Sequence, residues 1–172
     1  MKNIAFLWAI LAVSIGPSIA LAQEKPSMAG SWKLDITQSD FGSEPAPKLM
    51  AGRILTDTPQ MLSYRVHGVD DKGKPFAYSW SGPEDGSMHP TLVNGKPAGQ
   101  TGFMREHDGT VVQHGEDSDG STFEGHISLS PDGNTMTIAS NSKSKDGKES
   151  RGKQVWHRVS GSQQHNNGKP AS

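Results

Sequence analysis

The sequence contains no cysteine. That absence excludes a disulfide framework, a thiol nucleophile, a thiolate metal site and an acylated lipid anchor. Excess charge of one sign is also missing, since 17 Lys and Arg stand against 18 Asp and Glu. No basic stripe follows the chain, so no nucleic-acid partner is predicted.

Long apolar runs are missing everywhere except at the N-terminus, where the pattern is typical of an export signal. Lys2 precedes an apolar run over 4–15, Gly16 and Pro17 interrupt it, and small residues at Ala20 and Ala22 mark a cleavage site. The run is shorter than the roughly 20 residues of a permanent anchor. We predict a signal peptide over 1–22, a periplasmic or secreted bacterial location and no stable membrane insertion after cleavage.

Apolar residues are scarce in the rest of the chain, at about a quarter of residues 23–172. A β-strand with one wet face needs apolar side chains only at alternate positions. A helical bundle of the same length needs more of them. The composition therefore favours an all-β domain of ordinary size.

Turn signals recur every 9 to 14 residues, which leaves room for one strand between successive turns. Asp-Gly and Asn-Gly favour the positive φ angles of tight hairpins. The turns are Asp71-Lys72-Gly73, Asp85-Gly86, Asn94-Gly95, Asp108-Gly109, Asp119-Gly120, Asp132-Gly133 and Asp146-Gly147.

Between these turns the apolar residues alternate with polar ones, as in Leu62, Tyr64 and Val66. We predict ten strands, over 29–35, 48–57, 60–69, 74–82, 88–93, 98–107, 110–116, 121–130, 134–143 and 150–160. They form an up-and-down antiparallel meander of about 8–10 strands in one domain over 28–160. A closed barrel is the leading architecture, with an open twisted sheet or a sandwich as the alternative. A loop over 36–47, pinned by Phe41, and a disordered tail over 161–172 complete the prediction.

Two motifs carry a family resemblance. Gly30-Ser31-Trp32 opens the first strand and Val155-Trp156-His157-Arg158 closes the last. With these motifs the chain resembles lipocalin-like proteins, and in particular a group of secreted bacterial proteins, over residues 28–159. The resemblance implies that Trp32, after Gly30, closes one end of the barrel and stacks with Arg158. It also implies a ligand-binding role for the interior.

Six aromatic residues are candidates to line that interior: Tyr64, Phe76, Tyr78, Trp80, Phe103 and Phe123. They either surround a small apolar or aromatic molecule or simply fill the barrel. The leading hypothesis is thus an exported, non-catalytic binding module.

No motif specifies a reaction, a metal or a cofactor. The seven histidines show no His-x-His spacing, and no nucleophile elbow or phosphate loop is present. Two other hypotheses stay open. One is a cell-envelope interaction module that contacts an unknown protein partner through the irregular stretch 82–98. The other is an enzyme of unknown class, which needs a buried ionisable group such as Arg105 or Glu106 facing inward.

Overall fold

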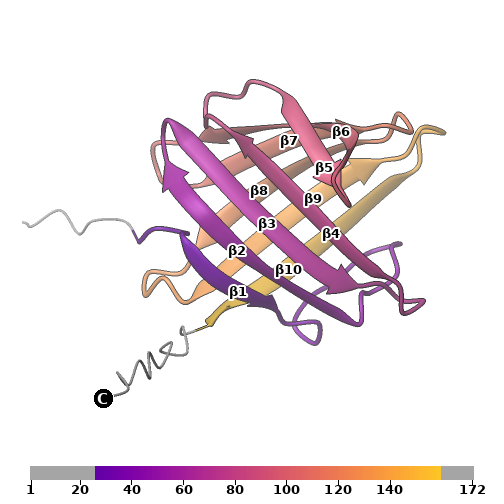
Figure 1. The fold of residues 1–172 in the computed structure, drawn as a ribbon, viewed down its shortest axis with the longest axis horizontal. Coiled ribbons are helices and arrows are strands. Elements are labelled where there is room, and N and C mark those ends of the chain that lie inside the picture. The colour runs from indigo at the N-terminus through magenta and orange to yellow at the C-terminus, as the bar shows by residue number, and fades with distance from the viewer. Residues whose placement is uncertain (1–25, 160–172) are drawn as a thin grey trace, which may run out of the picture.

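A computed structural model describes residues 26–159, which form ten β-strands and no helix (Figure 1). Within this range no helix has the length and apolar character of a membrane span. The strands are β1 (Gly30–Leu34), β2 (Leu49–Thr58), β3 (Met61–Val69), β4 (Pro75–Gly82), β5 (His89–Val93), β6 (Lys96–Arg105), β7 (Val111–Asp117), β8 (Thr122–Leu129), β9 (Thr135–Lys143) and β10 (Glu149–Val159).

The strands close into a barrel in which every neighbour in sequence is a neighbour in space and β1 pairs with β10. All pairs are antiparallel, and Figure 1 shows β1 and β10 side by side. The predicted all-β meander is confirmed as a closed barrel, which excludes the open sheet and the sandwich. Each strand begins and ends within two residues of its predicted bounds.

Five hairpins use the same turn, which explains the regular spacing of Asp-Gly in the sequence. In the turn between β8 and β9, Gly133 N donates to Ser130 O at 2.8 Å, and Asp132 Oδ1 accepts from Asn134 N at 3.0 Å. Gly133 has a φ of 71°, a conformation that disfavours larger residues. The same glycine N–H to carbonyl hydrogen bond occurs in the turns over 70–74, 106–110, 117–121 and 144–148, which close one residue sooner than the turn over 130–135.

Glycines on the inner face let aromatic rings lie flat against the barrel wall. A Cβ atom on Gly68 would meet the Phe76 ring at 2.6 Å, and one on Gly115 would meet the Phe123 ring at 2.3 Å. Each ring thus occupies the space that its glycine neighbour leaves open on the adjacent strand. This arrangement accounts for how a chain with few apolar residues still lines a closed sheet.

The stretch 36–47 continues from β1 along β10. Asp40 pairs with Lys153 through two backbone hydrogen bonds of 2.7 Å, and Phe41 packs against the core as predicted. The predicted signal peptide over 1–22 and the predicted disordered tail over 161–172 lie outside the described residues.

Candidate ligand-binding site

One end of the barrel is sealed by Trp32 and Arg158. Their Cα atoms face each other across β1 and β10, and the Arg158 guanidinium carbon lies 4.3 Å from the centre of the Trp32 ring. The Trp32 indole N–H donates to Met28 O at 2.8 Å. Arg158 donates to three carbonyls, those of Ser27, Ala29 and Gly133, at 2.6–2.7 Å. Trp32 is therefore fixed in position at this end, beneath the N-terminal segment.

A buried ionic cluster closes the same end on the opposite wall. Arg105 donates to both carboxylate oxygens of Glu84, at 2.6 and 2.8 Å, and also to Asp57. The Glu84 and Asp57 side chains are 0% and 3% exposed, while Arg105 is 26% exposed. Burial acts to lower the pKa of Arg105, but the hydrogen bond to Glu84 and the two carboxylate charges raise it. Asp57 also accepts from Met28 N at 2.6 Å, so the cluster anchors the N-terminal segment.

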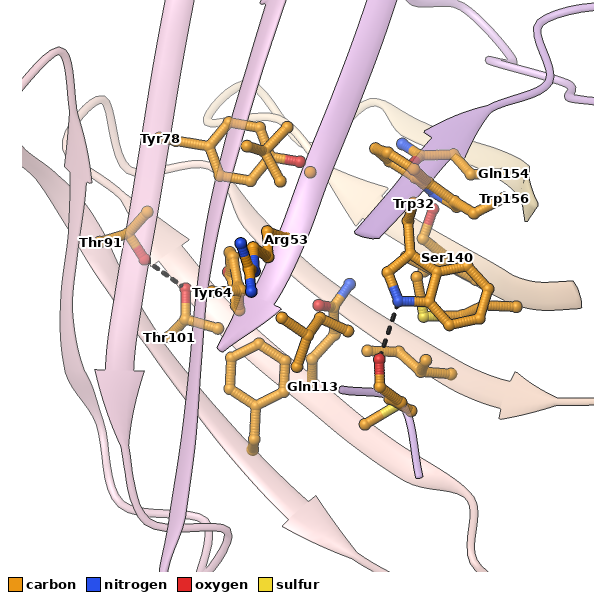
Figure 2. Close-up of a pocket in the computed structure, with 18 of the residues that line it drawn as sticks. Trp32, Arg53, Tyr64, Tyr78, Thr91, Thr101, Gln113, Ser140, Gln154 and Trp156 are labelled. Atoms are coloured by element: carbon orange, nitrogen blue, oxygen red, sulfur yellow. Dashed lines mark hydrogen bonds between the residues drawn. The ribbon is translucent and has the colours of Figure 1, made fainter. Parts of the chain in front are cut away.

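Above this sealed end the barrel holds a cavity of about 250 Å³ (Figure 2). Its wall is mainly aromatic and aliphatic. The lining side chains are contributed by all the strands and by the segment before β1. They are Met28, Trp32, Ile54, Tyr64, Val66, Tyr78, Thr91, Thr101, Phe103, Gln113, Phe123, Ile127, Met136, Ile138, Ser140, Gln154 and Trp156. Gly52 and Arg53 also border it; Arg53 occupies the outward position between Gly52 and Ile54 and is exposed.

Four of the six aromatic candidates border this cavity, namely Tyr64, Tyr78, Phe103 and Phe123. The other two do not. Trp80 is 3% exposed and packs against Phe103 with ring centres 4.5 Å apart, so it fills the sealed end. Phe76 stacks on Tyr78 with ring centres 6.3 Å apart, away from the cavity. A role of the four bordering rings in ligand contact stays a prediction.

The polar groups at the cavity wall fall into two classes. Some are satisfied by protein partners: Thr91 and Thr101 share a hydrogen bond of 2.8 Å, and Gln154 accepts from the Trp156 indole N–H at 3.1 Å. In contrast, the Gln113 carboxamide and the Ser140 hydroxyl make no hydrogen bond with any residue in 26–159. Both are half-buried and border the cavity.

Two tyrosine hydroxyls also belong to this wall. Burial raises the pKa of both Tyr64 and Tyr78 far above the usual tyrosine range. The Tyr78 hydroxyl lies 3.7 Å from the Met50 sulfur. Both groups are therefore neutral at any physiological pH, and they add no charge to the cavity.

Sequence reasoning missed Gln113 and Ser140. Both occupy inward-facing positions: Gln113 alternates with Val111 and Gly115 on β7, and Ser140 with Ile138 and Met136 on β9. Each is a polar residue at a position where the alternation along its strand predicts an inward-facing, apolar side chain. That departure from the pattern is the sequence signal that could have identified both residues.

The residues behind the other hypotheses lie elsewhere. Arg105 faces inward but is held by two carboxylates, and Glu106 is exposed. The stretch 82–98 contains β5, as predicted. The loop before β5 is held in place by Glu84, which is bonded to Arg105, and by Gly86 N, which donates to Phe103 O at 2.7 Å. Residues 26–159 contain no group of three or more His, Asp or Glu that could hold a metal ion.

Comparison with known proteins gives similarity of shape alone. No protein-family model and no curated protein sequence matches the chain. A redesigned β-barrel is 12% identical, with a TM-score of 0.46, over 77% of this chain and 92% of its own. A de novo designed fluorescence-activating β-barrel is 18% identical, with a TM-score of 0.37, over 76% and 93%. The S-type phycobiliprotein lyase CPES from Guillardia theta is 14% identical, with a TM-score of 0.43, over 78% and 89%. At these sequence identities and TM-scores, the similarity to the three structures supports no conclusion about function.

Proposed function

We propose that this protein is an exported, non-catalytic barrel that binds a small apolar or aromatic molecule in its interior. The observation that carries the proposal is the cavity of about 250 Å³, whose wall is mostly apolar and whose floor is sealed. A dry cavity of about 150 Å³ is large enough to hold benzene. The space here accommodates a molecule of one or two aromatic rings.

Half-burial of the wall supports the same function. Ile54, Tyr64, Tyr78 and Ile138 border the cavity with large, mainly apolar side chains, and none of them is fully buried. A ligand that covers them gains roughly 25 cal/mol for each Å² of apolar surface removed from water. Export is supported by the predicted signal peptide, which leaves Gln23 as the first residue of the mature protein.

Binding is tested by titrating the purified protein with naphthalene and following tryptophan fluorescence. Trp32 and Trp156 border the cavity, and Trp80 lies just beneath it, so we expect a saturable change in emission. Ser140→Leu places an apolar side chain in the cavity beside Gly125 and Gly152, its cross-strand neighbours, and should abolish the change. Flat emission in the wild type contradicts the proposal.

The matched control is Ser128→Leu, which makes the same change at an exposed position of β8. We expect this variant to bind naphthalene like the wild type. Equal loss in both variants would show that binding does not occur in the cavity. Export is tested separately by measuring the mass of the protein recovered from the periplasm of a bacterial host, which should correspond to a chain that begins at Gln23.

A further inference from the structure

Two polar side chains of the cavity wall, Gln113 and Ser140, lie at one level of the barrel. Five residues from consecutive strands face one another across the sheet at one level of the barrel: Phe103, Gln113, Gly125, Ser140 and Gly152. Because all five are inward-facing, the polar side chains of Gln113 and Ser140 are separated only by Gly125, which has no side chain.

The Gln113 carboxamide leans across that gap. A Cβ atom on Gly125 would meet the Gln113 amide nitrogen at 2.6 Å, so the absence of a side chain there is what makes room for the carboxamide. The Gln113 side chain therefore extends from β7 toward Ser140 on β9. Figure 2 shows Gln113 and Ser140 among the residues around the cavity.

Both groups make no hydrogen bond within residues 26–159, and the same is true of the Tyr64 hydroxyl, whereas Thr91 is bonded to Thr101 and Gln154 to Trp156. A carboxamide offers a carbonyl acceptor and an amide donor side by side. The polar atoms of Gln113 and Ser140 are accessible to solvent in the cavity, so a ligand that pairs with them replaces water and gains about 0.5–1.5 kcal/mol for each net hydrogen bond.

Charge at the cavity wall argues against an ionic ligand. Of the charged residues at inward-facing positions, Asp57, Glu84, Arg105 and Arg158 lie at the sealed end and are bonded to protein groups. Asp117 lies at the other end of the barrel, where it is exposed and does not border the cavity. A carboxylate or ammonium in the cavity has no described counter-ion, and burying an unpaired charge is strongly unfavourable.

From these observations we infer that Gln113 and Ser140 form a subsite for a neutral, planar aromatic ligand that carries a carboxamide or lactam edge. The aromatic body lies among Phe103, Phe123, Trp32 and Trp156, and the amide edge pairs with the Gln113 carboxamide and the Ser140 hydroxyl. This inference rests on the proposed function, and it adds the chemistry of the ligand.

Three probes with the same ring system distinguish a ligand with an amide edge from a purely apolar one and from an anionic one. They are 2-naphthamide, naphthalene and 2-naphthoate. We expect the wild type to bind 2-naphthamide about 3- to 10-fold more tightly than naphthalene, as one or two net hydrogen bonds provide. Binding of 2-naphthoate should be weaker than that of either neutral probe. The ratio of affinities is the readout, because it cancels changes in apolar packing.

Gln113→Met removes the carboxamide and keeps the length of the side chain. We expect it to reduce the preference for 2-naphthamide to about one while naphthalene binds as before. Ser140→Ala should reduce the preference in part, and it provides the same test if Gln113→Met does not fold. Gln100→Met makes the same change on the exposed face of β6 and should keep the wild-type ratio.

The outcomes distinguish the two proposals. If naphthalene binds but the ratio is unchanged in Gln113→Met and Ser140→Ala, or if 2-naphthoate binds most tightly, the subsite is overturned and the binding function stands. If none of the three probes binds to the wild type, both proposals fail.

Discussion

The two halves of the barrel interior differ although one continuous sheet builds both. The sealed end is filled by side chains that are at most 4% exposed, among them Trp32, Leu62, Trp80 and Phe103, of which Trp32 and Phe103 also form the floor of the cavity. The hollow half is lined by residues such as Ile54, Tyr64 and Ile138 that remain half-buried. Buried charge is also confined to the sealed end, where Asp57, Glu84 and Arg105 meet.

This difference indicates that the sealed half contributes more to the stability of the fold, whereas the hollow half leaves space for the proposed ligand. Close packing and satisfied polar groups stabilise a fold, whereas empty volume and unpaired polar groups destabilise it. In this barrel, close packing and paired polar groups are concentrated in the sealed half. The empty volume and the unpaired polar groups lie in the hollow half. This interpretation is tested by making substitutions in the sealed half and in the hollow half and comparing their effects on stability and binding.

Breaking the ionic cluster should have the largest effect. Arg105→Met leaves the Glu84 and Asp57 carboxylates buried without their cation, which we expect to cost about 3–5 kcal/mol of the free energy of unfolding. Urea denaturation measures this loss. The exposed Arg53→Met serves as the control and should change stability by less than about 0.5 kcal/mol. Similar losses in both variants would show that the cluster contributes little to sealing this end.

Truncation of apolar side chains should be costlier in the sealed half. Leu62→Ala removes atoms from a packed environment, with an expected loss of about 2–5 kcal/mol. Ile138→Ala removes atoms that already border empty space, so we expect about 1–2 kcal/mol. Thermal and urea denaturation of the two variants give the comparison. Equal losses would mean that the hollow half is as tightly packed in solution as the sealed one.

Filling the hollow half should stabilise the protein slightly. Ser140→Leu adds apolar volume beside two glycines, and cavity filling of this kind gains about 0.5–1 kcal/mol. The expected result is a higher melting temperature together with loss of naphthalene binding. A lower melting temperature would indicate that the space is too narrow for a leucine side chain.

The smallest predicted effect lies in a turn at the rim of the sealed end. The Ser130 hydroxyl and the Asn134 backbone N–H donate to Asp132 and lower the pKa of its carboxyl below the ordinary value of 3.8. Because the folded pKa is the lower one, the carboxylate stabilises the fold above that ordinary value, and this stabilisation is lost as the pH falls through the folded pKa.

Asp132→Asn keeps an acceptor in the turn but carries no charge. Its melting temperature should lie below that of the wild type at neutral pH, and the gap should close as the pH falls from the ordinary carboxyl pKa of 3.8 through the lower folded pKa. Melting curves followed by circular dichroism across that range measure the gap. A gap that is constant with pH would mean that the charge of Asp132 contributes nothing to the turn.

The fold could be predicted from the sequence because its signals are local. Asp-Gly and Asn-Gly fix hairpins through the φ angles of two or three residues, as in Asn94-Gly95, where both residues have positive φ. Alternation then assigns each strand an inner face. Barrel closure follows, since ten strands in a meander bring the first strand to the last.

The site was harder to predict because a cavity depends on what several strands leave unfilled. Nothing in the sequence around Trp80 or Phe76 shows that these rings pack away from the cavity while Tyr64 and Phe123 border it. That outcome is decided by the register between strands, which places Gly68 beneath Phe76 and Phe103 beside Trp80. The position of the Gln113 carboxamide is decided in the same way, by Gly125 on the adjacent strand.

The pairing of β1 with β10 has a consequence for how the chain reaches its final state. Arg158 donates to Ala29 O across 129 residues of sequence, so the seam cannot form until almost the whole chain is present. Contacts of such long range are slow to form because the intervening chain must first be ordered. The barrel therefore closes last at this seam, and its first nine strands have no closed sheet to join until β10 is in place.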